Sequence, residues 1–516
     1  MRKWHALMEI LQIPLKVLFI AVLFLGVGNL MTSSVFSSYW VIQNQYALIF
    51  AEILTRLGSF LILYSPFLFF LRLVSRRTNG IVTISMGLAG YFTFLICTIF
   101  FADPQFTQTV TSSLFGISIS SSKVSYLTGA HYPIQTGMIG IILLTFTTRL
   151  AYSQSRKKRA YGIFSFIDRD VWGMLLNAFY GVLLAFVVSV GWSFFMDGIN
   201  QIITFISSDI TNPINLFIYG GTEKILSALG LSNLIRNPFW FGSAGGTWAN
   251  LVGSSVAGDV NIWTTMTAQN LVPAGVGRFI TPSYVLNIFA IPGMIFAMYK
   301  LYSDRLERRT IRLFFVIAIL ASLLIGISLP LEIMLVLLCP LLFVFHVLFS
   351  GALYGIFQVL GVSLGFSYSG SSLLALPGNL LELLNYVRNP NYQQAVIYIA
   401  IIGAASALVY YGVTQIYFRY LAIDLFKGGE LVVYIEETID AMGGVENIRM
   451  LHSSINRITI QVYDSRNIDL FKIRELGASR IVETKAGFSL DYGPGSYIIR
   501  RGIEKRLKDT RRVEVA

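Results

Sequence analysis

The sequence is poor in cysteine. Among its 516 residues there are two, Cys97 and Cys339, and each lies inside an apolar run. Cysteines so placed allow no disulfide framework beyond a single long-range pair, and neither has the neighbouring ligands of a metal or redox site. The glycine-rich segment GSAGGTW at 242–248 lacks the spacing and the Lys-Ser/Thr ending of a phosphate-binding loop. We therefore expect no cofactor and no bound metal.

Charged residues are also scarce. They make up 13% of the chain, against 55% hydrophobic residues and a mean hydropathy of +0.66. These values are typical of a protein that crosses a membrane several times and argue against a soluble protein. The net charge of +12 could suggest a nucleic-acid partner. The basic residues instead flank apolar runs, as at 155–159 and 305–312, which is the pattern of cytoplasmic membrane loops. We expect contact with lipid and none with nucleic acid.

Apolar runs predict a polytopic α-helical membrane domain over residues 1–425, with about ten transmembrane helices and re-entrant segments. Residues 1–12 are amphipathic with a basic start, and we expect them to form a separate interfacial helix. Ten spans in a cell membrane would place both the N- and the C-terminus on its cytoplasmic side. The expected spans are 14–31, 49–73, 81–101, 135–152, 170–195, 285–302, 314–329, 331–349 and 398–420, with a mixed segment at 198–220 that Pro213 interrupts.

The segments between these runs are polar or irregular. Loops 32–45 and 102–133 have little charge and are expected outside the cell, and 242–282 and 351–388 are expected to be irregular. Pro330 joins two apolar runs and is expected to break or kink the helix there.

The composition changes near Asp424, and residues 430–507 read as a small soluble α/β sandwich, followed by a charged tail at 508–516. RITIQVY at 457–463 alternates apolar residues on one face, which predicts a strand. Further strands are expected at 480–483 and 488–492, with helices at 432–442, 467–476 and 495–507.

One stretch, YGGTEKILSALGLSNLIRNPFWF at 219–241, places charged and amide side chains deep in apolar sequence. Charged groups inside a bilayer cost several kcal/mol and tend to face a cavity or a partner. Short apolar segments broken by Gly and Pro indicate a midplane substrate site. The alternative is structural: Glu223 and Lys224 would cap a helix at the interface, and Arg236 would extend to the polar surface.

Four motifs, in order, resemble those of one family. They are the 219–241 stretch, which is similar to YGxxERLLIPxGLHHxLNxxFWF; GRF with IPGMIFAMYK; GISLPLEIMLVLLCPLLFVFHVLFSGA, which is similar to GxTEPxEFLFxFxAPxLYxxHxxLxG; and GGVENIRMLHSSINRITIQVYD, which is similar to GGxENIxxLxxCxTRLRxxxxD. The chain thus resembles sugar permeases of the bacterial phosphotransferase system, in the glucose/maltose/α-glucoside superfamily. The resemblance implies an enzyme IIC membrane domain followed by a IIB domain.

Such permeases move a sugar inward and phosphorylate it from a IIB cysteine. A thiolate suits that step because it is a good nucleophile that holds phosphate reversibly. Here Ser454 stands at the cysteine position and Asn456 replaces its usual threonine neighbour, although Arg457 is kept. A serine–histidine pair with the nearby His452 is disfavoured because no orienting carboxylate is evident.

The membrane domain also lacks the family's residues for phosphotransfer. The two histidines of the GLHH motif align with Ser232 and Asn233, the arginine of the ERLL element with Lys224, and the glutamate of the TEP element with Leu329. Only Glu332 remains as a carboxylate in that last segment. We therefore expect that the chain no longer phosphorylates its substrate.

Other side chains allow two interpretations. His346 lies in an apolar run, so a structural hydrogen bond is favoured over proton transfer. The aromatic residues Phe239, Trp240, Phe241 and Trp248 would either stack on a sugar or form an aromatic belt at the membrane interface.

These observations support three hypotheses. The first is a glucose-, maltose- or α-glucoside-like permease that transports without phosphorylation, whose substrate-binding residues are Lys224, Ser232, Asn233, Asn237, Trp240 and Glu332. The second is a membrane sensor derived from such a permease. The third is an active phosphotransferase that uses Ser454 or a separate IIB protein. The expected partners are a sugar and a IIA-type or regulatory cytoplasmic protein, and the family pattern implies a homodimer.

Overall fold

The computed structural model describes the backbone of residues 2–32, 44–75, 80–108, 115, 117–119, 129–157, 167–249, 255–302, 305–326, 328–366, 377–420, 430–478, 480–484 and 487–513. The predicted loop at 33–43, much of the 102–133 loop, the end of the basic run at 158–159 and the last residues at 514–516 lie outside these ranges. The described chain is mostly helical, at 76%, with a small sheet near the C-terminus.

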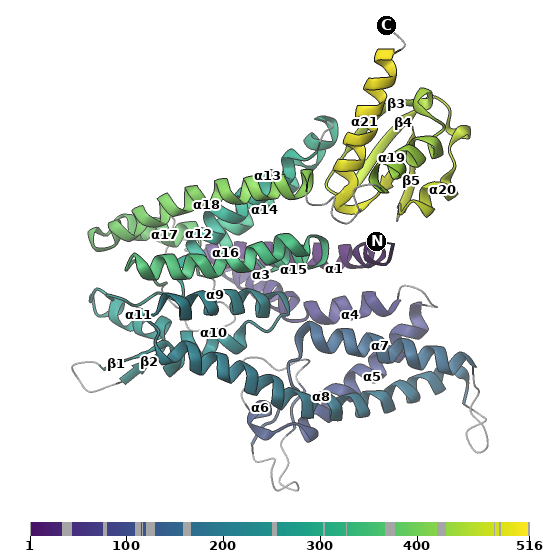
Figure 1. Ribbon diagram of the computed structural model, residues 1–516. Helices are drawn as coiled ribbons and strands as arrows, with labels where there is room; N and C mark the ends of the chain where they lie inside the picture. Colours follow the sequence, from purple (N-terminus) through teal and green to yellow (C-terminus); the bar gives the residue numbers. More distant parts are fainter. Residues whose placement is uncertain are drawn as a thin grey trace. The chain divides into compact units, whose positions relative to one another are not determined.

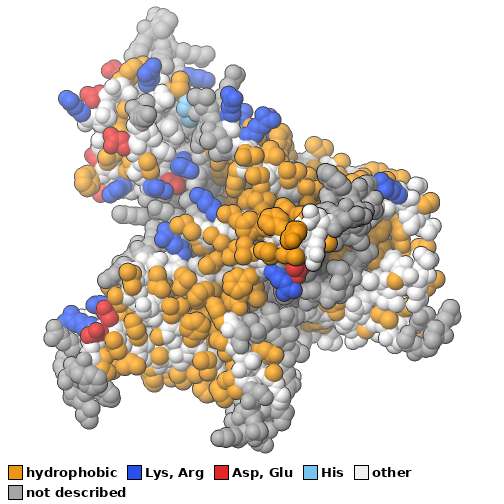
Figure 2. Space-filling view, turned by 180° about the vertical axis from the view of Figure 1, so that it is seen from behind, with side chains coloured by type: hydrophobic (Ala, Val, Ile, Leu, Met, Phe, Trp, Pro, Cys, Tyr) orange, Lys and Arg blue, Asp and Glu red, His pale blue; other side chains and the backbone are white. Residues whose placement is uncertain are grey.

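Seven helices in the described residues are long and apolar enough to cross a membrane, which indicates a membrane-associated protein. Several carry bulky apolar side chains on their exposed faces, and Figure 2 shows hydrophobic side chains over much of the surface in view. Two shorter apolar helices accompany them, at Ser65–Ser75 and Arg312–Ile325. The seven helices are Ile13–Met31, Gln45–Leu63, Gly80–Phe101, Arg169–Ser208, Thr281–Lys300, Pro340–Val359 and Pro390–Arg419.

The chain forms two compact units, and each draws on segments that are distant in sequence. One comprises residues 10–281 and 347–376, and the other 1–9, 282–346 and 377–516. We call them the first and the second unit. The boundary between 346 and 347 falls inside a single helix.

The first unit begins with helices that pack through small residues. Asn177 on α8 donates from Nδ2 to the Met86 carbonyl of α5 at 2.7 Å, and a Cβ on Gly181 would lie 2.6 Å from the Gly90 carbonyl. This close approach explains why α5 and α8 run side by side in Figure 1. The helices are α1 (Arg2–Thr32), α3 (Gln45–Leu63), α4 (Ser65–Ser75), α5 (Gly80–Phe101), α6 (Pro104–Gln108), α7 (Gly137–Lys157) and α8 (Arg169–Ser208).

Three boundaries in this part differ from the sequence prediction. Residues 2–12 continue into the first span without a break, so the prediction of a separate interfacial helix is wrong. A proline such as Pro14 is tolerated inside a membrane helix where its surroundings satisfy the freed backbone group. The expected span 49–73 is two helices that meet at Tyr64. Helix α8 runs on to Ser208, so the mixed segment at 198–220 is helical on both sides of a short turn before Pro213.

The rest of the first unit contains α9 (Pro213–Ala228), α10 (Asn233–Trp240), η3 (Ser243–Gly245), strands β1 (Thr247–Ala249) and β2 (Ser255–Ala257), and α11 (Asp259–Ala268). The two strands form an antiparallel hairpin. The described parts of 242–282 therefore contain more regular structure than the glycine content predicted.

The second unit contains α12 (Thr281–Val285), a π-helical turn η4 (Leu286–Ala290), α13 (Ile291–Lys300), α14 (Arg305–Ile325), α15 (Leu329–Leu338), α16 (Pro340–Val359, shared with the first unit), α17 (Leu380–Val387), η6 (Pro390–Tyr392) and α18 (Gln393–Arg419). Gly293 allows α13 to approach α18, because a Cβ there would lie 2.6 Å from the Ala407 carbonyl. The prediction of an irregular segment at 351–388 is wrong for 351–359 and 380–387, which are helical, whereas 367–376 is outside the described residues.

The predicted break between the two apolar runs is present, and Pro330 lies directly after it. Helix α14 ends at Ile325, and Pro330 lies in the first turn of α15. Proline is favoured there because its missing N–H would have no partner within the helix. The second interruption of this apolar stretch is at Cys339, between α15 and α16.

The C-terminal domain, also in the second unit, is a four-stranded antiparallel sheet with helices. Its strand order is β3-β4-β6-β5, and its core contains Ile458, Ile460, Leu490 and Ile499. The elements are α19 (Glu430–Ala441), η8 (Val445–Asn447), β3 (Ile448–Ser453), β4 (Arg457–Val462), η9 (Ser465–Asn467), α20 (Leu470–Glu475), β5 (Arg480–Thr484), β6 (Gly487–Asp491), η10 (Gly493–Gly495) and α21 (Ser496–Val513).

Most predicted elements of this domain are present, and one strand was missed. Strand β3 does not alternate strictly, because its pairing with β4 shifts register between Ile448 and Met450. Such an irregularity puts apolar residues out of the period-two pattern by which strands are recognised. Helix α21 extends to Val513, so part of the predicted charged tail at 508–516 is helical.

Candidate substrate site

Two short helices carry the charged stretch that the sequence singled out. Asn212 caps α9 by accepting from the Ile214 amide at 2.9 Å, and Pro213 occupies the first turn. The helix ends at Ala228. In the turn that follows, Gly230 has a φ of +73°, which suits glycine, and the Leu231 amide donates back to the Leu226 carbonyl at 2.7 Å. Helix α10 then begins within three residues of Gly230, so α9 and α10 meet at a tight turn.

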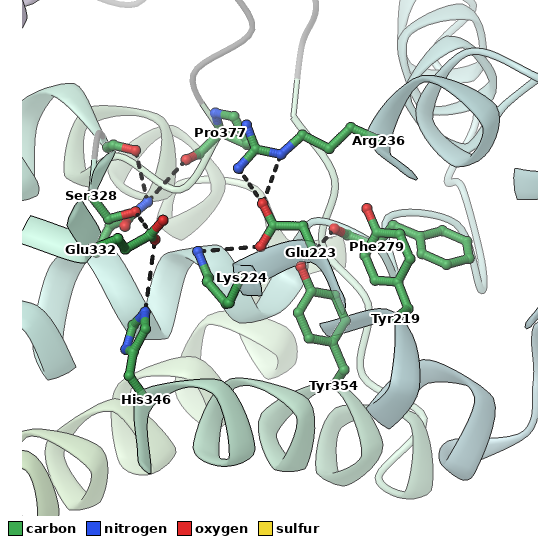
Figure 3. A network of polar contacts seen from close by, with 12 residues as sticks. Tyr219, Glu223, Lys224, Arg236, Phe279, Ser328, Glu332, His346, Tyr354 and Pro377 are labelled. Carbon is green, nitrogen blue, oxygen red and sulfur yellow. Dashed lines mark hydrogen bonds and ion pairs between the residues drawn. The ribbon is translucent and has the colours of Figure 1, made fainter. Parts of the chain in front are cut away.

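The charged side chains of this stretch form one buried cluster in the first unit (Figure 3). Glu223 on α9 accepts from Nε of Arg236 on α10 at 2.7 Å and also from Nη2 of the same guanidinium. Lys224 Nζ lies 3.3 Å from the other carboxylate oxygen of Glu223. Glu223 and Lys224 are 3% and 5% exposed and lie within α9 rather than at its ends. Their burial within α9 argues against the alternative in which Glu223 and Lys224 cap a helix at the membrane interface.

Aromatic side chains surround the cluster. Trp240 Nε1 donates to Tyr219 Oη at 2.9 Å, and the Arg236 guanidinium lies 5.1 Å from the Trp240 ring centroid. Tyr354 Oη donates to the Phe279 carbonyl at 3.1 Å, and both rings contact Tyr219 (Figure 3). Trp240 is buried, which argues against its place in a lipid-facing aromatic belt and leaves the stacking role as a prediction.

Three other predicted site residues lie on or beside α10, and none of them is fully buried. Ser232 and Asn233 lie at the start of α10, where Ser232 is half-buried and Asn233 is exposed. Asn237 is half-buried, and its carbonyl accepts from the Phe241 and Gly242 amides. The structure thus brings Lys224 and Trp240 together with Glu223 and Arg236, two residues that the final set of predicted site residues omitted.

Glu332 belongs to a separate polar cluster in the second unit (Figure 3). Ser328 Oγ donates to Glu332 Oε1 at 2.6 Å, and His346 Nε2 lies 3.7 Å from the same oxygen. His346 Nδ1 and Tyr410 Oη are 2.8 Å apart, which confirms the expected buried hydrogen bond of this histidine. Leu329, which the resemblance aligns with a glutamate, is the first residue of α15.

The sequence gave no prominence to a buried carboxylate in the first unit, Asp259. Its Oδ1 accepts from the Gly277 amide at 2.8 Å and its Oδ2 from the Phe279 amide at 3.4 Å. Gly277 is required there: its φ is +94°, and a Cβ would lie 2.3 Å from the Gly365 nitrogen. Asp259 therefore holds the GRF turn against α11. The only sequence signal was an acidic residue at a helix start.

Burial raises the pKa of Asp259 to about 6 from 3.8, although its backbone hydrogen bonds and Arg278 act in the opposite direction. A raised carboxyl pKa favours folding below the unfolded-state pKa, and this contribution is lost as the pH rises through about 6. As the pH rises from about 4 to about 7, we expect the free energy of unfolding of the wild-type protein to fall by about 3 kcal/mol relative to that of the Asp259→Asn variant. Thermal unfolding in detergent at several pH values measures this. Asp440→Asn, at an exposed position on α19, is the control, and parallel pH curves for wild type and Asp259→Asn would contradict the prediction.

The C-terminal domain buries Ser454, the residue expected from the family resemblance to stand where a cysteine carries phosphate. Ser454 is 2% exposed and lies directly after β3, and its amide donates to the Arg457 carbonyl at 2.8 Å across the turn into β4. The Asn456 carbonyl accepts from the Tyr492 and Gly493 amides, which ties this turn to the end of β6. Arg457 is exposed. A hydroxyl placed in this way cannot receive a phosphoryl group from another protein without movement of the turn.

A comparison with models of known protein families found none that matches the chain. Among the described residues, no three or more His, Cys, Asp or Glu side chains are grouped so that they could hold a metal ion. The fold and the two clusters define a helical membrane protein with buried ionic groups and a C-terminal α/β domain.

Proposed function

We propose that the protein is a sugar permease of the enzyme IIC type, with a IIB-like C-terminal domain, that transports its substrate without phosphorylating it. The observation that carries the proposal is the buried Glu223–Lys224–Arg236 cluster on the short helices α9 and α10. Glu223 and Lys224 are buried and Arg236 is half-buried beside them, and ionic side chains placed among apolar helices are costly even when paired, so they commonly mark a functional site. Interrupted short helices of this kind carry the binding site in many transporters.

The cluster is chemically suited to a neutral polyhydroxylated ligand. Lys224 and Arg236 offer N–H donors, Glu223 offers acceptor oxygens, and Trp240 offers an aromatic face beside them. Sugars present hydroxyl donors and acceptors together with apolar ring faces, so each of these groups has a complement. The motifs that resemble glucose, maltose and α-glucoside permeases favour the same ligand class.

Loss of phosphotransfer is supported by chemistry and by burial together. Serine is a far weaker nucleophile than cysteine at neutral pH, and the hydroxyl of Ser454 is on a buried turn. Ten spans with both termini in the cytoplasm belong to this proposal as the apolar runs and basic loops predict. A IIB fold and a homodimer belong to it as the family resemblance implies.

Counterflow in proteoliposomes tests the proposal. Vesicles that hold purified protein and unlabelled glucose or maltose are diluted into labelled sugar, with no phosphoryl donor present. We expect saturable accumulation of label in exchange for internal sugar, because the site needs no covalent step. Empty vesicles and an unrelated sugar alcohol are the controls. Exchange that requires a phosphoryl donor would instead establish an active phosphotransferase.

A sensor is the second candidate function. The observation in its favour is that the C-terminal domain keeps a complete apolar core while its acceptor position is buried, so the domain can serve as a binding module. Sugar binding without counterflow, together with specific capture of a cytoplasmic regulator by the full chain, would favour it over the permease.

A further inference from the structure

A row of polar side chains lies among the helices of the second unit (Figure 3). It runs from Ser328 through Glu332 on α15 and His346 on α16 to Tyr410 on α18. Glu332 and His346 are both fully buried, at 0% exposure, and Tyr410 is buried as well. Two ionisable groups from neighbouring helices contact the imidazole: the Glu332 carboxylate at Nε2 and the Tyr410 hydroxyl at Nδ1.

The end of α14, which precedes the row in sequence, is held by Asn287 on the π-helical turn. Asn287 Nδ2 donates to the Gly326 carbonyl at 3.0 Å and to the Pro377 carbonyl at 3.3 Å. Ser322 Oγ in turn donates to the Asn287 carbonyl at 2.6 Å. π-Helical turns often occur at functional sites. The end of α14, with Gly326 two residues before Ser328, is therefore tied to the π-helical turn.

The geometry accommodates the imidazole in either protonation state. When Nδ1 is unprotonated, the Tyr410 hydroxyl can donate to it, and when Nδ1 carries a proton, the same hydroxyl oxygen can accept from it. At the other ring nitrogen, the Glu332 carboxylate stabilises an imidazolium by opposite charge. Histidine changes charge near physiological pH, and ionisable side chains inside membrane helices commonly form proton pathways.

We propose that His346, with Glu332 as its counter-ion, is the binding site of a proton that crosses the membrane together with the sugar. The inference rests on the proposed transport function, and it adds that a proton gradient supplies the energy for sugar accumulation. A proton from one aqueous side adds to the imidazole, and the same proton leaves to the other side after transport, so one positive charge moves with each neutral sugar. A permease without phosphotransfer would otherwise only equilibrate its substrate.

A pH gradient provides the test. Proteoliposomes that hold the full chain, about two pH units more alkaline inside, are given labelled glucose or maltose. With one proton per sugar we expect accumulation approaching about a hundredfold over the external concentration, since each pH unit corresponds to a factor of ten. A protonophore is expected to abolish the accumulation. Counterflow is measured on the same vesicles without a gradient.

Variants separate proton binding from a structural role of the row. His346→Asn is expected to lose gradient-driven accumulation but keep counterflow, because exchange needs no net proton movement. Glu332→Gln is expected to weaken gradient-driven accumulation while counterflow persists, because the protonated imidazole loses the carboxylate 3.7 Å away that compensates its charge. His131→Asn is the matched control: His131 is equally buried but bonds Thr107 Oγ1 at 2.6 Å, and its loss should leave accumulation unchanged.

The outcomes distinguish this inference from the function on which it rests. Wild-type counterflow without gradient-driven accumulation would overturn proton coupling and leave the permease standing. Full accumulation in His346→Asn would exclude this histidine as the proton site. If His346→Asn loses counterflow as well, a second variant, His346→Gln, decides: loss of both activities again would assign the row a structural role. Absence of wild-type counterflow would remove the permease and this inference together.

Discussion

Arg236→Gln is expected to destabilise the protein by about 3 kcal/mol. Glu223 is 3% exposed and accepts two hydrogen bonds from the Arg236 guanidinium. Removing one partner of a buried ion pair leaves a desolvated charge with weaker compensation, which costs several kcal/mol. Lys224 remains beside the carboxylate, so we expect the lower end of that range. Thermal unfolding in detergent, followed by the intrinsic fluorescence of the chain, measures the loss.

Two further variants test the cause. The triple substitution Glu223→Gln, Lys224→Met and Arg236→Gln removes all three charges of the cluster and is expected to recover at least half of the lost stability, because no unpaired buried charge remains. Arg56→Gln is the matched control: Arg56 pairs with Glu52 on α3, but the two side chains are 80% and 52% exposed. Exposed pairs contribute about 0.5 kcal/mol or less. Equal losses at Arg236 and Arg56 would show that the cluster is not buried in the native protein.

Lys224→Met is expected to lower counterflow by about 10- to 100-fold while the protein stays folded. Hydrogen bonds to charged groups contribute about 1.5–3 kcal/mol, and each 1.4 kcal/mol corresponds to a factor of ten in affinity. Glu223 keeps its two bonds to Arg236 in this variant, so the fold is less affected than by loss of the arginine. The measurement is the initial rate of exchange at several sugar concentrations, which separates a change in affinity from a change in maximal rate.

The control for this substitution is Lys300→Met. Lys300 lies at the end of α13 and is exposed, with its ammonium 5.2 Å from the Phe296 ring centroid. The same chemical change there should leave exchange within about twofold of wild type, because exposed cation–π contacts contribute under about 1 kcal/mol. Unchanged exchange in Lys224→Met would remove this lysine from the substrate site. Ser232→Ala and Asn233→Ala are then the next variants to measure.

Local pattern alone identified much of the architecture. Long apolar runs with few charges predict membrane helices because the bilayer rejects unpaired polar groups, and α5, α7 and α18 begin and end near the predicted residues. Alternating apolar residues identified β4, and β5 and β6 also lie where strands were predicted. The charged stretch at 219–241 stood out because ionic groups are rare in apolar sequence. The same reasoning missed β3, whose register shift interrupts the alternation.

The sequence by itself determined the membrane class, the C-terminal α/β domain and the position of the unusual charges, because each depends on the composition of a continuous segment. Only the tertiary structure decided which charges meet. The Glu223–Arg236 pair depends on the turn at Gly230 between α9 and α10. The His346–Glu332 and His346–Tyr410 contacts join side chains that are 14 and 64 positions apart in the chain, on three helices. Such pairs depend on how helices pack, which no local pattern records.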